Sequence, residues 1–110
     1  MGEMSEKTEG VMGPDYGIRA FQSQIESIYL GRDSKRGKEG STLWFIEEVG
    51  ELIRALRRGE RENLEEEFAD VFAWMSSLAS IEGIDLAGVV LEKYGKGCPR
   101  CKETPCGCPE

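Results

Sequence analysis

Five acidic residues stand at two helical spacings in the middle of the chain. Glu47, Glu48 and Glu51 lie close together, and Glu67 and Asp70 follow after a short spacer. At about 100° per residue, the first three side chains share one sector of a helix, and the i, i+3 pair shares one side of another. If the two helices are antiparallel neighbours, the five carboxylates face one another. Such a group repels itself unless protons or cations compensate its charge.

Composition narrows the chemistry that this group can perform. The chain has 110 residues with 14 Lys+Arg, 21 Asp+Glu and no histidine, which gives a formal charge of −7. Without histidine there is no Ser-His-Asp or Cys-His nucleophile and no imidazole-based metal site. A hard divalent cation such as Mg²⁺ prefers oxygen ligands and leaves positions for substrate phosphates, and two such ions can clamp a phosphoryl displacement. The alternative is ordinary surface charge, because acid-rich helices are common.

Helices must position these acids. Apolar residues recur at helical spacing over residues 15–30, 42–58, 64–81 and 86–94, and strand signals are nearly absent. The sequence therefore predicts an all-α fold, a four-helix bundle of one domain. The residues expected to cap the N-termini of these helices are Asp15, Ser41, Asn63 (in a capping box with Glu66) and Asp85. The glycines expected to end the helices are Gly31, Gly59, Gly83 and Gly95.

Three parts make up the expected domain organisation. We expect a disordered arm over 1–13, a helical domain over 14–96 and a cysteine-rich tail over 97–110. A chain this short buries a modest core, so self-association would complete it. No apolar run approaches the roughly 20 residues that a membrane span needs, and residues 1–13 are polar and acidic, so we expect no signal peptide there. We expect a cytoplasmic protein without a membrane or nucleic-acid partner, since its charge is acidic.

The full sequence around the five acids is a more specific signal of function than the spacing of the acids alone. EEVGEL (Glu47 to Leu52) followed by EFAD (Glu67 to Asp70) resembles the signature of the MazG-like nucleotide pyrophosphohydrolases, in the all-α NTP pyrophosphatase superfamily: E-E-x-x-E, a spacer, then E-x-x-D on neighbouring helices. The resemblance covers roughly residues 16–96 and includes Phe21 and the GIDL turn (Gly83 to Leu86). It implies hydrolysis of a nucleoside triphosphate, (d)NTP, to the monophosphate and pyrophosphate by metal-activated water, in a homodimer or homotetramer.

The resemblance also implies roles for the individual acids. By motif position, Glu48, Glu51, Glu67 and Asp70 are the expected Mg²⁺ ligands, with Mn²⁺ as an alternative ion. Glu47, the first acid of the pair, is expected to act catalytically by activating or orienting the attacking water. A carboxylate base with metal-bound water needs no histidine, so these roles suit the composition.

Nucleotide binding needs further cations and a surface for the base. Lys93 and Lys96 near the chain's end are expected to contact phosphate, as the resemblance suggests; otherwise they are solvated lysines at a helix end. The Gly-rich segment 31–40 reads either as a solvated connector or as a basic flap that meets an anionic ligand. Its cations compete for the phosphate role, and the full set of expected substrate-binding residues is Lys93, Lys96, Gln22, Arg32 and Trp44, with Lys35, Arg36 and Lys38 as competitors. Trp44 alternatively packs in the core.

Four cysteines crowd the end of the chain in the pattern C-x₂-C-x₄-C-x-C. They are Cys98, Cys101, Cys106 and Cys108. Cytosolic clusters of four cysteines usually hold Zn²⁺, and a closed four-sulfur site is structural because it leaves no position for catalysis. The alternatives are redox-active thiols, a disulfide pair and an unstructured tail.

Two other functions remain open from the sequence. A phosphoribosyl-ATP pyrophosphohydrolase resembles the same motif, although the GIDL segment and the absence of that family's aromatic-His region argue against it. From a different class, a non-catalytic helical binding module would use the cysteine knuckle to contact a partner protein or single-stranded nucleic acid.

Overall fold

The computed structural model of the chain describes residues 17–110, and regular structure in that range is entirely helical. Helix α2 runs Ile18–Arg58, α3 runs Arg61–Ile81 and α4 runs Leu86–Tyr94. The predicted all-α class is therefore confirmed. The expected arm over 1–13 and the expected N-cap Asp15 lie outside the described residues, and α2 begins after Gly17.

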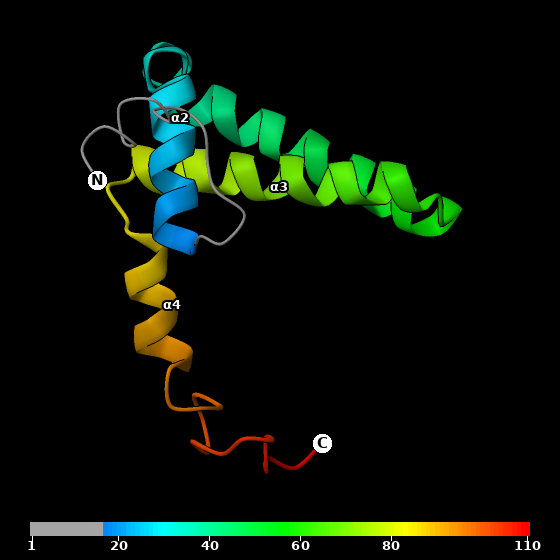
Figure 1. Cartoon of the computed structure of the whole chain (residues 1–110), viewed down its shortest axis with the longest axis vertical. Helices are drawn as coiled ribbons and strands as arrows, with labels where there is room; N and C mark the ends of the chain where they lie inside the picture. Colours follow the sequence, from blue (N-terminus) through cyan, green and yellow to red (C-terminus); the bar gives the residue numbers. More distant parts are fainter. Residues whose placement is uncertain (1–16) are drawn as a thin grey trace, which may run out of the picture.

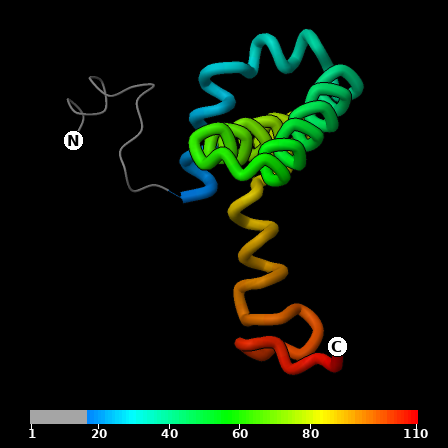
Figure 2. Tube along the Cα trace, turned by 90° about the vertical axis from the view of Figure 1, so that its right-hand side faces the viewer, coloured from blue at the N-terminus to red at the C-terminus, as the bar shows by residue number. Residues whose placement is uncertain are grey.

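The loop expected over residues 31–40 is absent, and that prediction was wrong. Helix α2 continues through it, and only Gly37 departs from helical geometry, with φ 80° and ψ 176°. Figure 2 shows the consequence: the first part of α2 (blue to cyan) and its second part (green) run in different directions. The two helices expected here are thus the two arms of α2, joined at a single residue. A positive φ is accessible to glycine without a Cβ clash, so one glycine is enough for the bend.

Contacts on either side of Gly37 hold the bend. Arg36 Nη1 lies 2.8 Å from Asp33 Oδ1 and 3.3 Å from the Ser41 Oγ atom. Ser41, expected to begin a helix, lies instead inside α2 and is fully buried. Lys38 Nζ pairs with Glu82 Oε2 at 3.0 Å, which ties the bend to the end of α3. The bend is therefore an ordered part of α2, held by these contacts, in place of the expected loop.

Three of the four glycines expected to end helices do so, Gly59, Gly83 and Gly95, whereas Gly31 lies inside α2 and that prediction was wrong. Gly59 closes α2 with φ 71°, and its N–H donates to the Ala55 carbonyl at 2.9 Å. Gly83 has φ 72° after α3, and the Ile84 N–H returns to the Ala79 carbonyl at 2.8 Å, as in a Schellman motif. The predicted start of α3 was wrong: the helix begins at Arg61, so the expected capping box lies within its first turns.

The second arm of α2 and helix α3 form an antiparallel hairpin across the short link at Gly59 (Figure 1). Stacked rings join α3 to both arms of α2: Trp44 on the second arm stacks on Trp74 with ring centroids 5.9 Å apart, and Phe21 on the first arm stacks on Phe72 at 4.9 Å. The hairpin buries little else. Among the described residues, the buried apolar side chains are Ala55 and Ala79 in the hairpin and Ile25 on the first arm of α2.

Helix α4 leaves α3 at 99° and leads the chain away from the hairpin (Figure 1). Gln22, which is only 5% exposed, holds this turn: its Nε2 donates to Ser80 Oγ and to the Ile84 carbonyl, and its Oε1 accepts from the Leu86 N–H at 2.9 Å. Asp85 precedes α4 as expected but caps it with no side-chain hydrogen bond.

No single described helix is both long and apolar enough to cross a membrane; only the bent pair α3 and α4, taken together, meets the length and composition criterion.

Candidate functional site

The hairpin brings three of the predicted acids together. One carboxylate oxygen each from Glu48 on α2 and from Glu67 and Asp70 on α3 all lie within 4.8 Å of one another. Glu48 and Glu67 are half-buried, and Asp70 is exposed. The i, i+3 spacing on α3 places its two acids one turn apart on the side that faces Glu48. We name these three residues the acid cluster.

The other two predicted acids lie around this cluster. Burial raises the pKa of Glu67, and the charge of Glu51 is the next cause. Burial also raises the pKa of Glu48, followed by the charges of Glu51, Asp70, Glu67 and Glu47 in that order. Half-buried Glu51 therefore raises the pKa of both carboxylates, whereas exposed Glu47 is the last of the causes for Glu48 and is not among those for Glu67.

Two oxygens of the cluster need a partner that the protein does not supply. Glu48 Oε1 and Glu67 Oε1 are shielded from solvent and have no hydrogen-bond partner in the described protein. A shielded carboxylate oxygen without a partner is costly, and a hard divalent cation relieves both the missing bond and the repulsion. The donor set is oxygen-only, so the residues present fit Mg²⁺ or a similar ion.

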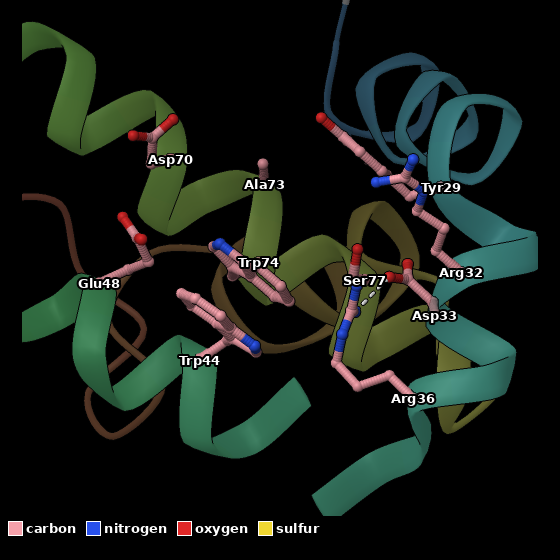
Figure 3. A pocket seen from close by; sticks show the side chains of 10 residues that line it. All are labelled: Tyr29, Arg32, Asp33, Arg36, Trp44, Glu48, Asp70, Ala73, Trp74 and Ser77. Carbon is pink, nitrogen blue, oxygen red and sulfur yellow. Dashed lines mark hydrogen bonds and ion pairs between the residues drawn. The ribbon is translucent and has the colours of Figure 1, made fainter. Parts of the chain in front are cut away.

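A cavity of about 310 Å³ opens beside the acid cluster. Figure 3 shows that it has an acidic end, with Glu48 and Asp70, and a basic end, with Arg32 and Arg36. Two indole rings lie between these ends. A ligand that carries phosphates could thus meet the acid cluster through cations at one end and guanidinium groups at the other.

The basic end comes from one face of the first arm of α2. Tyr29, Arg32, Asp33 and Arg36 stand at i, i+3, i+4 and i+7, and all four line the cavity. Asp33 is buried, and its ion pair fixes the Arg36 guanidinium, whose Cζ lies 4.9 Å from the ring centroid of Trp74. Arg36 is therefore preorganised to receive an anionic group.

The indole pair forms the middle of the cavity. The rings of Trp44 and Trp74 are nearly parallel, at 7°, and Trp44 is 47% exposed. A flat, partly open aromatic surface suits stacking of a planar ring, such as a nucleobase. Trp44 thus packs against α3 and lines the cavity as well, so the two alternatives left open for it are compatible.

Three of the expected substrate-binding residues are not among those that line the cavity. Gln22 is engaged at the turn into α4, as described above. Lys93 lies on α4, with its Nζ 5.7 Å from the Tyr94 ring centroid, and Lys96 follows that helix. Their contact with a substrate stays a prediction.

Tyr29 and Asp33 line the cavity but were not among the residues predicted from the sequence to bind substrate. Their spacing with Arg32 and Arg36 is typical of one helical face, and it would have identified them had residues 31–40 been treated as helix. The glycines of that segment favoured a loop and concealed the pattern.

The four cysteines also come together, beyond the end of α4. Their Sγ atoms all lie within 4.8 Å of one another, and none of them forms a disulfide. Backbone N–H groups of Cys101 and Arg100, in that order, are the main causes that lower the pKa of Cys98 to about 6.

Comparison with known proteins agrees with the geometry of the acid cluster. The family model for the MazG nucleotide pyrophosphohydrolase domain matches residues 36–103, which is more than half of the chain. The match includes all five acids, Arg36 and both indole rings of the cavity. A search of the curated proteins finds no significant match. The first arm of α2 up to residue 35 lies outside the match, although it supplies Arg32 to the cavity. With its paired acids on a helical hairpin, this chain belongs to the MazG nucleotide pyrophosphohydrolase family.

Proposed function

We propose that the protein is a Mg²⁺-dependent nucleoside triphosphate pyrophosphohydrolase, which converts a (d)NTP to the (d)NMP and pyrophosphate. The observation that carries this proposal is the acid cluster with its two shielded, unpartnered carboxylate oxygens. Membership in the family supports the reaction class, and the cavity that joins the cluster to two arginines supports a polyphosphate substrate.

The acids divide into two roles in this proposal. Glu48, Glu51, Glu67 and Asp70 would hold the metal, with Mn²⁺ as an alternative ion. When bound, Mg²⁺ supplies positive charge beside the substrate phosphates and makes water more acidic. Glu47, the first acid of the motif, accepts a proton from the attacking water; it is exposed, whereas Glu51 is half-buried beside the three-acid group.

The other groups of the cavity orient the substrate. Arg32 and Arg36 donate hydrogen bonds to phosphate oxygens at the basic end, and the planar guanidinium group is suited to two parallel bonds. The Trp44 and Trp74 rings offer a stacking surface for the base. Attack at the α-phosphorus then releases pyrophosphate.

Association of the chain through its helices belongs to the same proposal. Large apolar side chains stay exposed on both helices of the hairpin, with exposed fractions of 69% for Leu43, 61% for Ile46 and 54% for Phe68. A monomer rarely leaves so much apolar surface open, and burial between copies would remove it from water. We infer a homodimer or a homotetramer.

The first prediction concerns activity. Purified protein with Mg²⁺ should release pyrophosphate from at least one of a panel of (d)NTPs that also contains phosphoribosyl-ATP. Glu48→Gln and Asp70→Asn should each lower kcat/KM by at least about 100-fold, since even outer-shell partners of metal ligands are worth about 10- to 100-fold.

Glu62→Gln is the matched control, because Glu62 is an exposed acid in the first turn of α3 and lies outside the acid cluster. It should keep wild-type activity. The proposal would be contradicted if metal-replete protein released pyrophosphate from none of the nucleotides. If the protein hydrolysed phosphoribosyl-ATP alone, that compound and not a (d)NTP would be the substrate.

The second prediction concerns stability without metal. Because the fold raises the pKa of Glu48 and of Glu67, it disfavours their ionised forms. In EDTA, the melting temperature should therefore rise as the pH falls from neutral toward the ordinary carboxyl pKa of about 4.3. Glu48→Gln should melt higher than the wild type in EDTA at neutral pH, and it should respond less to added Mg²⁺. Differential scanning fluorimetry measures both effects; a variant that melts lower in EDTA would argue against repulsion within the cluster.

The third prediction concerns the basic end of the cavity. Arg36→Ala should raise KM for the best nucleotide by about 10- to 100-fold, as expected for loss of a charge-assisted hydrogen bond worth about 1.5–3 kcal/mol. Arg36→Lys keeps the positive charge but loses the planar guanidinium group, so its KM should lie between those of the wild type and of Arg36→Ala. Lys35→Ala is the control, because Lys35 is exposed on the same helix and does not line the cavity. Equal KM values for all three variants and the wild type would remove Arg36 from the site.

The fourth prediction concerns association. Light scattering coupled to gel filtration should give two or four times the chain mass of 12.3 kDa. The double variant Leu43→Lys/Ile46→Lys should shift toward a monomer, because it places charges in the apolar face. Thr42→Lys adds a charge at an exposed polar neighbour and should keep the wild-type mass. A wild type that elutes as a monomer at all concentrations would contradict association.

A further inference from the structure

The cysteine loop, residues 97–110, has a geometry that the proposed hydrolase activity does not use. Cys98 Sγ lies 3.8 Å from Cys108 Sγ and 3.6 Å from Cys106 Sγ. Four sulfurs around one Zn²⁺ at about 2.3 Å would stand about 3.8 Å apart at the corners of a tetrahedron. A disulfide needs about 2.05 Å, and one sulfur with two such neighbours cannot belong to two disulfides. The spacing matches a shared central ion better than it matches paired cysteines.

Backbone hydrogen bonds build the loop around the sulfurs. The Gly107 N–H donates to Cys101 Sγ, and the Cys108 N–H donates to Cys106 Sγ, both at 3.3 Å. Donors aimed at sulfur favour the thiolate, which is the form that binds metal. The Lys102 N–H closes the turn onto the Cys98 carbonyl at 2.7 Å.

The cysteine loop is fastened directly to α4. The Gly95 N–H donates to the Leu91 carbonyl at 2.8 Å, and the Gly97 N–H donates to the Tyr94 carbonyl at 3.1 Å. Gly97 has φ 104°, and a Cβ added there would stand 3.0 Å from the Glu103 carbonyl oxygen. Glycine at this position lets the loop fold back at once onto the helix end, so no free linker separates the two.

We propose that the cysteine loop binds one Zn²⁺ through the thiolates of Cys98, Cys101, Cys106 and Cys108 and thereby stabilises the C-terminal end of α4. Four protein ligands fill a tetrahedral site, so neither water nor substrate reaches the ion and the site is structural. Four thiolates with Zn²⁺ carry a net charge of −2, and Lys96, Arg100 and Lys102 supply positive charge within or beside the loop, which also contains Glu103 and Glu110.

The zinc site is separate from the acid cluster in place and in chemistry. Figures 1 and 2 place the cysteine loop at the far end of α4, whereas the acid cluster lies between α2 and α3. Soft thiolates select Zn²⁺, and carboxylates suit Mg²⁺. Zinc binding therefore does not depend on the proposed hydrolase function, and it stands if that function fails.

Metal analysis of the full-length protein, purified under reducing conditions without chelator, tests the proposal. The wild type should contain about one zinc per chain, and the Cys98→Ser/Cys101→Ser double variant should contain almost none. Glu48→Gln is the matched control: it changes the acid cluster alone and should keep the full zinc content. Reduced, metal-free wild type should bind Co²⁺ with the visible spectrum of a tetrahedral thiolate site.

A structural readout comes from trypsin, whose cleavage sites include Arg100 and Lys102. Zinc should slow cleavage after these residues by at least about tenfold relative to the chelator-treated wild type, because bound ion closes the local opening that proteolysis needs. This comparison needs no variant and so does not depend on the double variant folding.

Four results would overturn the proposal. The first is protein that lacks zinc and that, with its thiols reduced, added Zn²⁺ does not protect from trypsin. The second is iron in place of zinc, and the third is recovery of the cysteines as disulfides from reducing buffer. The fourth is a double variant that keeps its zinc.

Discussion

Negative charge held between two helices is the constraint on which the rest of this structure depends. Three carboxylates of the acid cluster approach one another, and no ion pair in residues 17–110 compensates them. Packing elsewhere in the hairpin holds them there: Ala55 is buried near the link, and Trp44 stacks on Trp74. Such an arrangement disfavours the ion-free fold, which is typical of sites where a protein gives up stability for function. The unpartnered oxygens of Glu48 and Glu67 identify where a cation would act.

The bend at Gly37 complements that charge with positive groups. Only through this bend can a single helix supply acids from one arm and arginines from the other to the same cavity (Figure 3). Residues 29–36 would otherwise continue along the axis of the second arm, away from Trp74. Buried Asp33 then fixes Arg36, so its orientation needs little ordering when an anion binds. The same bend, through Lys38 and Glu82, ties both arms of α2 to α3.

The features that were predicted correctly from the sequence depend on the local periodicity of the helices. The spacing of Glu48 with Glu67 and Asp70 translates into shared helix faces because the turn at Gly59 leaves little choice of orientation. The segment around Gly37 was wrongly predicted as a loop because several glycines favour one, whereas the φ and ψ angles of Gly37 alone change the direction of the helix. The partners of Gln22 were beyond prediction for a different reason: they lie at the turn between α3 and α4, far away in sequence, and only tertiary packing brings them together.

The lack of histidine separates the two metal chemistries that we propose for this chain. Imidazole binds many divalent ions, so a histidine in either group would weaken the distinction between them. Here the hairpin offers only oxygens, and the cysteine loop offers only sulfurs. Each donor set favours one class of ion, and the 99° turn between α3 and α4 keeps the two sets at separate ends of the fold. A small chain can therefore keep its proposed catalytic ion exchangeable, with waters and phosphates as further ligands, while a closed thiolate site holds its other ion as part of the structure.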